Sequence, residues 1–189
     1  MTLLTRRSFV HLALTTAAAA AFPEVATAKE SPDWRLNALN RDRCLKLIRP
    51  QSGEQAVFCY WRKDKGWDMD GYRQACWLLR DVQYNAQVQM DPGLLDTLFI
   101  LQIWLATYGQ NHEIRVNSGY RTAKHNSRLE NAAKNSMHLY GKAADIRIPG
   151  VSPKLLSDMG KMLGLGGVGL YEKQGFIHVD RGSVRSWKG

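Results

Sequence analysis

Residues 136–145 read Ser-Met-His-Leu-Tyr-Gly-Lys-Ala-Ala-Asp, and residues 175–180 read Gly-Phe-Ile-His-Val-Asp. These two stretches contain three side chains that divalent metal ions favour, namely His138, Asp145 and His178. A catalytic zinc ion takes three protein ligands of the histidine or carboxylate type and leaves a fourth position open for water. The two stretches therefore predict a zinc site, and Gly141 lets the backbone turn between the first two ligands.

The second stretch has the alternation of a β-strand. Phe176, His178 and Asp180 are expected to face one way, while Ile177 and Val179 face the core. Spacing alone does not establish a metal site, because such a trio is more often a capped turn with two surface histidines. The rest of the sequence has to decide between these two interpretations.

Hydrophobic periodicity outside these stretches predicts strands and helices that are segregated rather than strictly alternating. The expected strands are 43–48 and 55–61, joined as a hairpin through the turn 50–53, then 113–118, 142–148, and an antiparallel pair formed by 166–171 and 175–180. The expected helices begin after Asp68 or Asp70, run from Pro92 to Gly109 in the centre of the core, and cover 122–133 and 153–163. The pattern predicts an α+β fold in which a small antiparallel sheet carries the zinc site and packs against helices.

The N-terminal segment has the features of an export signal. Residues 1–28 contain Arg6 and Arg7, a 14-residue apolar run and a small-x-small site, and we interpret them as a twin-arginine-type signal peptide. A plain secretory signal is the alternative. Residues 29–41 are expected to form an extended N-terminal arm, and residues 42–189 a single domain. The expected location is the periplasm.

Composition and charge restrict the partners. The chain has 189 residues and a net charge of +9, and removal of residues 1–28 would leave +8. These values exclude low-complexity and disordered classes and suit an anionic partner such as a carboxylate-rich cell-wall polymer. The six tryptophans form no stacking pattern with the basic residues, so we expect no nucleic-acid partner. After residue 28 no apolar run reaches the length of a membrane span, so no integral membrane segment is expected there.

Three cysteines, Cys44, Cys59 and Cys76, allow at most one internal disulfide. Cys44 and Cys59 lie on the two strands of the expected hairpin, and Cys76 lies in a helical pattern. Buried free thiols are an equally good interpretation. The pairing therefore stays open at this point.

The combined motifs resemble the LAS metallopeptidases, the group that contains lysostaphin-type enzymes, D-Ala-D-Ala peptidases and hedgehog-type domains. The residues that carry the likeness are Ser118-Gly119-Tyr120-Arg121, Asn126, Ser136-x-His138-x-x-Gly141-x-Ala143-x-Asp145, Gly167-x-Gly169-x-Tyr171 and Phe176-x-His178-x-Asp180. The chain is most similar to the YcbK-like murein endopeptidases over roughly residues 42–187. The resemblance implies one Zn²⁺ held by His138, Asp145 and His178.

The resemblance also implies roles around the metal. Arg121 matches the arginine that faces the substrate and its oxyanion in D-Ala-D-Ala peptidases, and a surface salt bridge is its alternative role. Ser136 is expected to set the turn before His138, and Tyr120 is taken with Arg121 and Ser136 as a substrate contact. The general base is where the sequence departs from the family. The usual glutamate and histidine positions hold Gly175 and Phe176.

Two carboxylates remain as candidate bases. Glu172 has the spacing from His178 that hedgehog-type domains show, and Asp180 shares a strand face with His178 but is more suited to orienting a ligand or Arg121. Solvated charges at a strand end are the alternative for both. The resulting hypothesis is zinc-dependent hydrolysis of peptide cross-links between peptidoglycan stem peptides. The alternatives are a non-catalytic zinc-containing module that binds cell-wall peptide, and a carboxypeptidase on free muropeptides. The bond that is cut, the oligomeric state and the regulation do not follow from the sequence.

Overall fold

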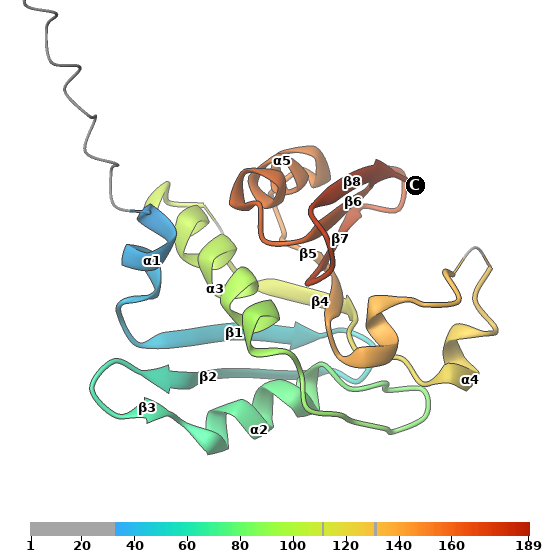
Figure 1. Ribbon diagram of the computed structural model, residues 1–189, viewed down its shortest axis with the longest axis horizontal. Coiled ribbons are helices and arrows are strands. Elements are labelled where there is room, and N and C mark those ends of the chain that lie inside the picture. Colours follow the sequence, from blue (N-terminus) through green and yellow to red (C-terminus); the bar gives the residue numbers. More distant parts are fainter. Residues whose placement is uncertain (1–32, 111, 131) are drawn as a thin grey trace, which may run out of the picture. The chain divides into compact units, whose positions relative to one another are not determined.

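The computed structural model describes residues 33–110, 112–130 and 132–189 (Figure 1). The helices are α1 (Trp34–Leu39), α2 (Met69–Leu78), α3 (Pro92–Thr107), α4 (Ala123–Asn126), the 3-10 helix η1 (Met137–Tyr140) and α5 (Pro153–Leu163). The strands are β1 (Arg43–Arg49), β2 (Glu54–Arg62), β3 (Gly66–Trp67), β4 (Ile114–Ser118), β5 (Ala143–Arg147), β6 (Gly167–Tyr171), β7 (Phe176–Asp180) and β8 (Arg185–Lys188). The expected signal peptide lies outside the described residues.

All eight strands join one sheet in the order β3-β2-β1-β4-β5-β7-β6-β8. Most neighbours are antiparallel, and the β1–β4 and β6–β8 pairs are parallel. The α+β class and the hairpin of β1 and β2 are confirmed. The sheet is larger than the small antiparallel sheet expected, because β3 and β8 extend it at both edges.

Helix α3 forms the centre of the core because it is apolar on nearly all sides. Leu94, Leu98 and Leu101 are completely buried on it, and the Asp91 side chain accepts a hydrogen bond from the Leu94 amide to begin the helix. In Figure 1, α3 crosses beside β1, and α5 lies by the β6–β8 part of the sheet. Truncating a fully buried leucine here to alanine is expected to cost about 2–5 kcal/mol of folding free energy.

Helix α5 is amphipathic, with Ser152 as its N-cap and Gly164 in the left-handed conformation at its end. Leu156 and Leu163 pack into the core, as the periodicity predicted. Leu155 and Met162, which the same stripe included, are exposed. The apolar stripe of α5 is therefore narrower than expected, and the helix buries a single face against β6 and β7.

Two local expectations were wrong. The arm expected over 29–41 contains helix α1, which begins at the Asp33 cap, buries Ala38 and sets Trp34 edge-on to Trp104 of α3. The helix expected over 122–133 is only the single turn α4. The reasons are physical: α1 is too short to show a period, and residues 122–133 lack the apolar stripe that would hold a longer helix against the core.

Cys44 and Cys59 form a disulfide between β1 and β2, and Cys76 is a buried free thiol. This resolves the pairing that the sequence left open. Among residues 33–110, 112–130 and 132–189, none of the helices combines the length and apolarity needed to cross a membrane.

Candidate metal centre

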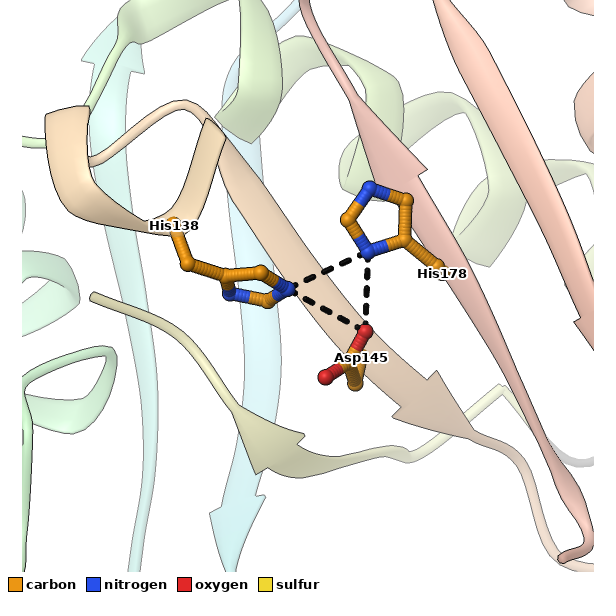
Figure 2. Close-up of side chains that lie close together, drawn as sticks. All are labelled: His138, Asp145 and His178. Atoms are coloured by element: carbon orange, nitrogen blue, oxygen red, sulfur yellow. Dashed lines mark hydrogen bonds and ion pairs between the residues drawn. The ribbon is translucent and has the colours of Figure 1, made fainter. Parts of the chain in front are cut away.

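The three predicted ligands come from three different elements and point toward one another (Figure 2). His138 lies on η1, Asp145 on β5 and His178 on β7. Because β5 and β7 are hydrogen-bonded neighbours, Asp145 stands directly opposite His178 in the register. The Ser136 side chain caps η1, and Gly141 ends it in the left-handed conformation, so the chain turns back into β5.

The donor atoms are close enough to share one ion. His138 Nε2 lies 3.1 Å from His178 Nδ1 and 3.3 Å from Asp145 Oδ1, and the last two atoms are 2.9 Å apart. All three residues are buried. A tetrahedral zinc with bonds of about 2.0–2.1 Å has donor atoms separated by roughly 3.3 Å. The cluster therefore fits a small divalent ion with two imidazole nitrogens and one carboxylate oxygen as ligands.

Each imidazole is oriented through its other nitrogen. His138 Nδ1 lies 2.5 Å from the Gly119 carbonyl oxygen, and His178 Nε2 lies 2.9 Å from Asp180 Oδ2. An acceptor at the second nitrogen fixes the tautomer, so that the lone pair of the first nitrogen faces the cluster. This arrangement is typical of metal ligands.

The charges of the cluster also suit a cation. Burial lowers the pKa of His138, which keeps that imidazole neutral. Burial alone would raise the pKa of Asp145, but the contacts with His138 and His178 hold it well below its ordinary value. Burial would lower the pKa of His178, yet Asp145 and Asp180 outweigh it and raise that pKa. A metal ion would therefore compete with a proton at His178.

Asp180 contacts the nitrogen of His178 that faces away from the cluster and is not one of the three converging donors. Its side chain is completely buried, and it accepts hydrogen bonds from the amides of Gly167 and Gly182 and from Arg185 as well as His178. These partners outweigh the effect of burial and hold the pKa of the carboxyl far below its usual value. Asp180 is thus positioned to orient His178, the role the sequence favoured over that of a base.

Arg185 and Trp187, both on β8, belong to the site although the sequence interpretation missed them. Arg185 Nη2 lies 2.7 Å from Asp180 Oδ2, and the Trp187 ring lies 5.2 Å from the His178 ring. The sequence signal that could have revealed them is Gly167-x-Gly169 of β6. A Cβ on Gly169 would lie 2.6 Å from the Trp187 ring, so glycine leaves the space that this ring occupies beside β6.

Arg121 and Ser136 are at the site, and Tyr120 is next to it. The Arg121 guanidinium forms an ion pair with Asp145, and its Nε donates to Ser118 Oγ at 2.7 Å. Arg121 and Ser136 line a pocket of about 760 Å³ that contains the metal cluster. Tyr120 lines a neighbouring cavity instead.

Glu172 is not where the hypothesis of a general base needs it. It is exposed, does not line the pocket, and acts electrostatically on Lys154 of α5. Glu172 is the first residue of the turn 172–175 that follows β6, whereas Tyr171 at the end of β6 lines the pocket. Glu130, after α4, is exposed and does line the pocket.

Comparison with known proteins agrees with this geometry. Residues 37–187 match the family model described as "Peptidoglycan L,D-endopeptidase MepK". A protein of Haemophilus influenzae named probable peptidoglycan L,D-endopeptidase MepK is 40% identical over 129 residues, which are 66% of this chain and 68% of that protein. Peptidoglycan L,D-endopeptidase MepK of Escherichia coli K12 is 30% identical over 161 residues, 83% of this chain and 86% of that protein. The chain belongs to the MepK family of peptidoglycan L,D-endopeptidases.

Proposed function

We propose that this protein is a zinc-dependent murein endopeptidase that hydrolyses peptide cross-links between peptidoglycan stem peptides. The single observation that supports this most strongly is the convergence of His138, Asp145 and His178 at the base of an open pocket, in a chain of the MepK family. The relatives are named as a probable and an assigned peptidoglycan L,D-endopeptidase, and the same bond type is the proposed substrate here.

The ligand set fits zinc, which we assign as the metal. When bound, zinc polarises the scissile carbonyl and makes a water molecule acidic enough to attack it near neutral pH. Arg121 is fixed by Asp145 and Ser118 at the pocket wall. A permanently charged guanidinium at this place stabilises the negative charge that develops on the carbonyl oxygen. Asp180 orients His178 through its buried carboxylate.

The proton acceptor is neither Asp180 nor Glu172 in this proposal. Asp180 is completely buried and bound on both oxygens, and Glu172 lies outside the pocket. Among the described residues that line the pocket, Glu130 is the carboxylate left without an ion-pair or hydrogen-bond partner. A base needs a free lone pair in the space where the water attacks, and Glu130 has such a lone pair and lines the same pocket as the cluster.

A second candidate function is a non-catalytic module that binds zinc and cell-wall peptide. The full engagement of Asp180 favours it, because it removes one of the two predicted bases. A carboxypeptidase on free muropeptides is a third candidate. Periplasmic location, with export through the twin-arginine pathway, fits a peptidoglycan substrate and is part of the proposal.

The decisive test is mass spectrometry of muropeptides after incubation of intact sacculi with zinc-loaded protein, beside a chelated control. The proposal expects cross-linked dimers to become monomers only in the zinc-loaded sample. Stoichiometric zinc and muropeptide binding without turnover would favour the binding module. Release of single terminal residues from free muropeptides, with intact sacculi unchanged, would favour the carboxypeptidase.

The base assignment is tested by a matched pair of variants. Glu130→Gln should lower kcat roughly 10²-fold or more, because it removes the proton acceptor while keeping the side-chain shape. Glu172→Gln, which makes the same change outside the pocket, should alter kcat less than about twofold. A large loss in Glu172→Gln with an active Glu130→Gln would reverse the assignment.

A further inference from the structure

A second cavity, of about 390 Å³, adjoins the metal pocket. Arg121 and Leu129 line both spaces, so the two cavities meet at these side chains. The other residues of its wall include Arg49, Asn117 and Tyr120. We call it the Arg49 cavity. Its position makes it the next contact for a peptide that extends from the metal centre.

Arg49 has the unusual feature that its buried charge has no carboxylate partner among the described residues. The residue is only 4% exposed. Its guanidinium donates two long hydrogen bonds, 3.3 Å to the Val116 carbonyl oxygen and 3.4 Å to that of Arg80, and its Nε has no partner in the described part of the chain. Burying an unpaired cation is costly, and a guanidinium carries five N–H donors. Burial and the nearby Arg80 charge lower the pKa of Arg49 to about 10.

The neighbouring charges do not neutralise Arg49 directly. Arg80 is paired with Glu54 at 2.9 Å, and Arg121 is paired with Asp145. Asp81, the buried acid closest in sequence to Arg80, accepts hydrogen bonds from Thr122 and His125. Each acid around the cavity therefore has a partner of its own. None of these acids forms an ion pair with Arg49, although the charges of Asp81 and Asp145 oppose the lowering of its pKa.

We propose that the Arg49 cavity is a carboxylate-binding subsite, in which Arg49 binds a free carboxylate of the stem peptide near the bond that is cut. This inference rests on the proposed function. A guanidinium matches a planar carboxylate with two parallel hydrogen bonds, and desolvation in a recess strengthens them. Stem peptides carry free carboxylates close to their cross-links, so substrate and cavity are complementary in charge.

The test compares two synthetic cross-linked stem-peptide dimers, one with free carboxylates beside the cross-link and one with carboxamides there. Metal-loaded protein should cleave the free acid with a KM at least about tenfold lower. In Arg49→Gln the KM for the free-acid dimer should rise until it equals that for the carboxamide dimer, so the preference is lost. Arg147→Gln, which removes an exposed cation from β5, should keep the preference. Arg49→Lys should keep part of it, because the charge stays but the bidentate geometry is lost.

Binding separates this inference from the proposed function. Calorimetry with an uncleavable stem-peptide monomer should show at least about tenfold tighter binding of the acid than of the carboxamide to the unmodified protein. Equal binding and equal cleavage of both forms would overturn the subsite, even if cleavage itself is efficient. Preferential binding without any cleavage would keep the subsite and refute the proposed endopeptidase. If Arg49→Gln fails to fold, the comparison of acid and carboxamide on the unmodified protein still decides.

Discussion

Among the described residues, the histidine–aspartate pairs His178–Asp180 and His125–Asp81 have similar donor–acceptor distances but different surroundings. His178 Nε2 lies 2.9 Å from Asp180, and His125 Nδ1 lies 3.0 Å from Asp81. Both aspartate side chains are completely buried, and the histidine side chains are 10% and 21% exposed, respectively. The pairs alone give no reason to assign a metal to one and not to the other.

The difference lies at the second nitrogen of each imidazole. His178 Nδ1 meets His138 and Asp145, whereas the metal-compatible cluster found among the described residues does not include His125. Asp81 also accepts from the backbone and hydroxyl of Thr122, so it fixes the start of α4. A histidine–aspartate pair therefore has the geometry of a metal site only where other donors converge on it.

The largest difference between the two pairs should follow from removing one of the donors that surround His178. His138→Ala should lose stoichiometric zinc and reduce hydrolysis of cross-linked muropeptides by roughly 10³-fold or more, because several kcal/mol of transition-state stabilisation depend on the metal. Elemental analysis and muropeptide mass spectrometry measure both effects. The matched change His125→Ala should keep the zinc. Full metal content in His138→Ala would refute the ligand assignment.

A smaller effect is expected when the partner of His178 loses its charge. Asp180→Asn should weaken zinc affinity by about 10–100-fold, since the amide orients the imidazole less well and makes it a poorer ligand. Competition titration with a chromophoric chelator measures the affinity. Asp81→Asn serves as the control and should leave it unchanged. An equal loss of zinc affinity in Asp180→Asn and Asp81→Asn would indicate a general effect on folding instead.

The smallest effect concerns stability at the second pair. Asp81→Asn should lower the free energy of unfolding by about 2 kcal/mol at pH 7, because charge-assisted bonds to Thr122 and His125 are lost. Burial would raise the pKa of Asp81, but its bonds to Thr122 and His125 lower it on balance. A lowered pKa in the folded state stabilises above the unfolded pKa of about 4, and this stability is lost as the pH falls through the folded value. Urea unfolding at pH 7 and pH 3 should therefore show a smaller difference between variant and parent at pH 3.

Sequence reasoning worked best where one local pattern dominates. Asp91 followed by Pro92 marks the start of α3, and Ser152 and Gly164 mark the two ends of α5, all as the structure has them. It missed α1, which is too short to show a period and packs against α3. It also predicted too long a helix over 122–133, where no apolar face holds more than the single turn α4. Glu172 shows the same limit, since its spacing from His178 suits a base but its side chain, in the turn after β6, is exposed and does not line the pocket.

The sequence by itself identified the three donor side chains, because histidine and aspartate are residue types that bind divalent ions wherever the fold brings them together. It also showed the glycines of β6, but not that the Trp187 ring occupies the space beside Gly169. Only the tertiary structure decided that β8 brings Arg185 behind Asp180 and Trp187 beside His178, and that Arg49 is buried next to Arg121 without an acid of its own. The physical reason is that charge balance and desolvation depend on contacts between distant segments, and the order of residues along the chain does not specify those distances.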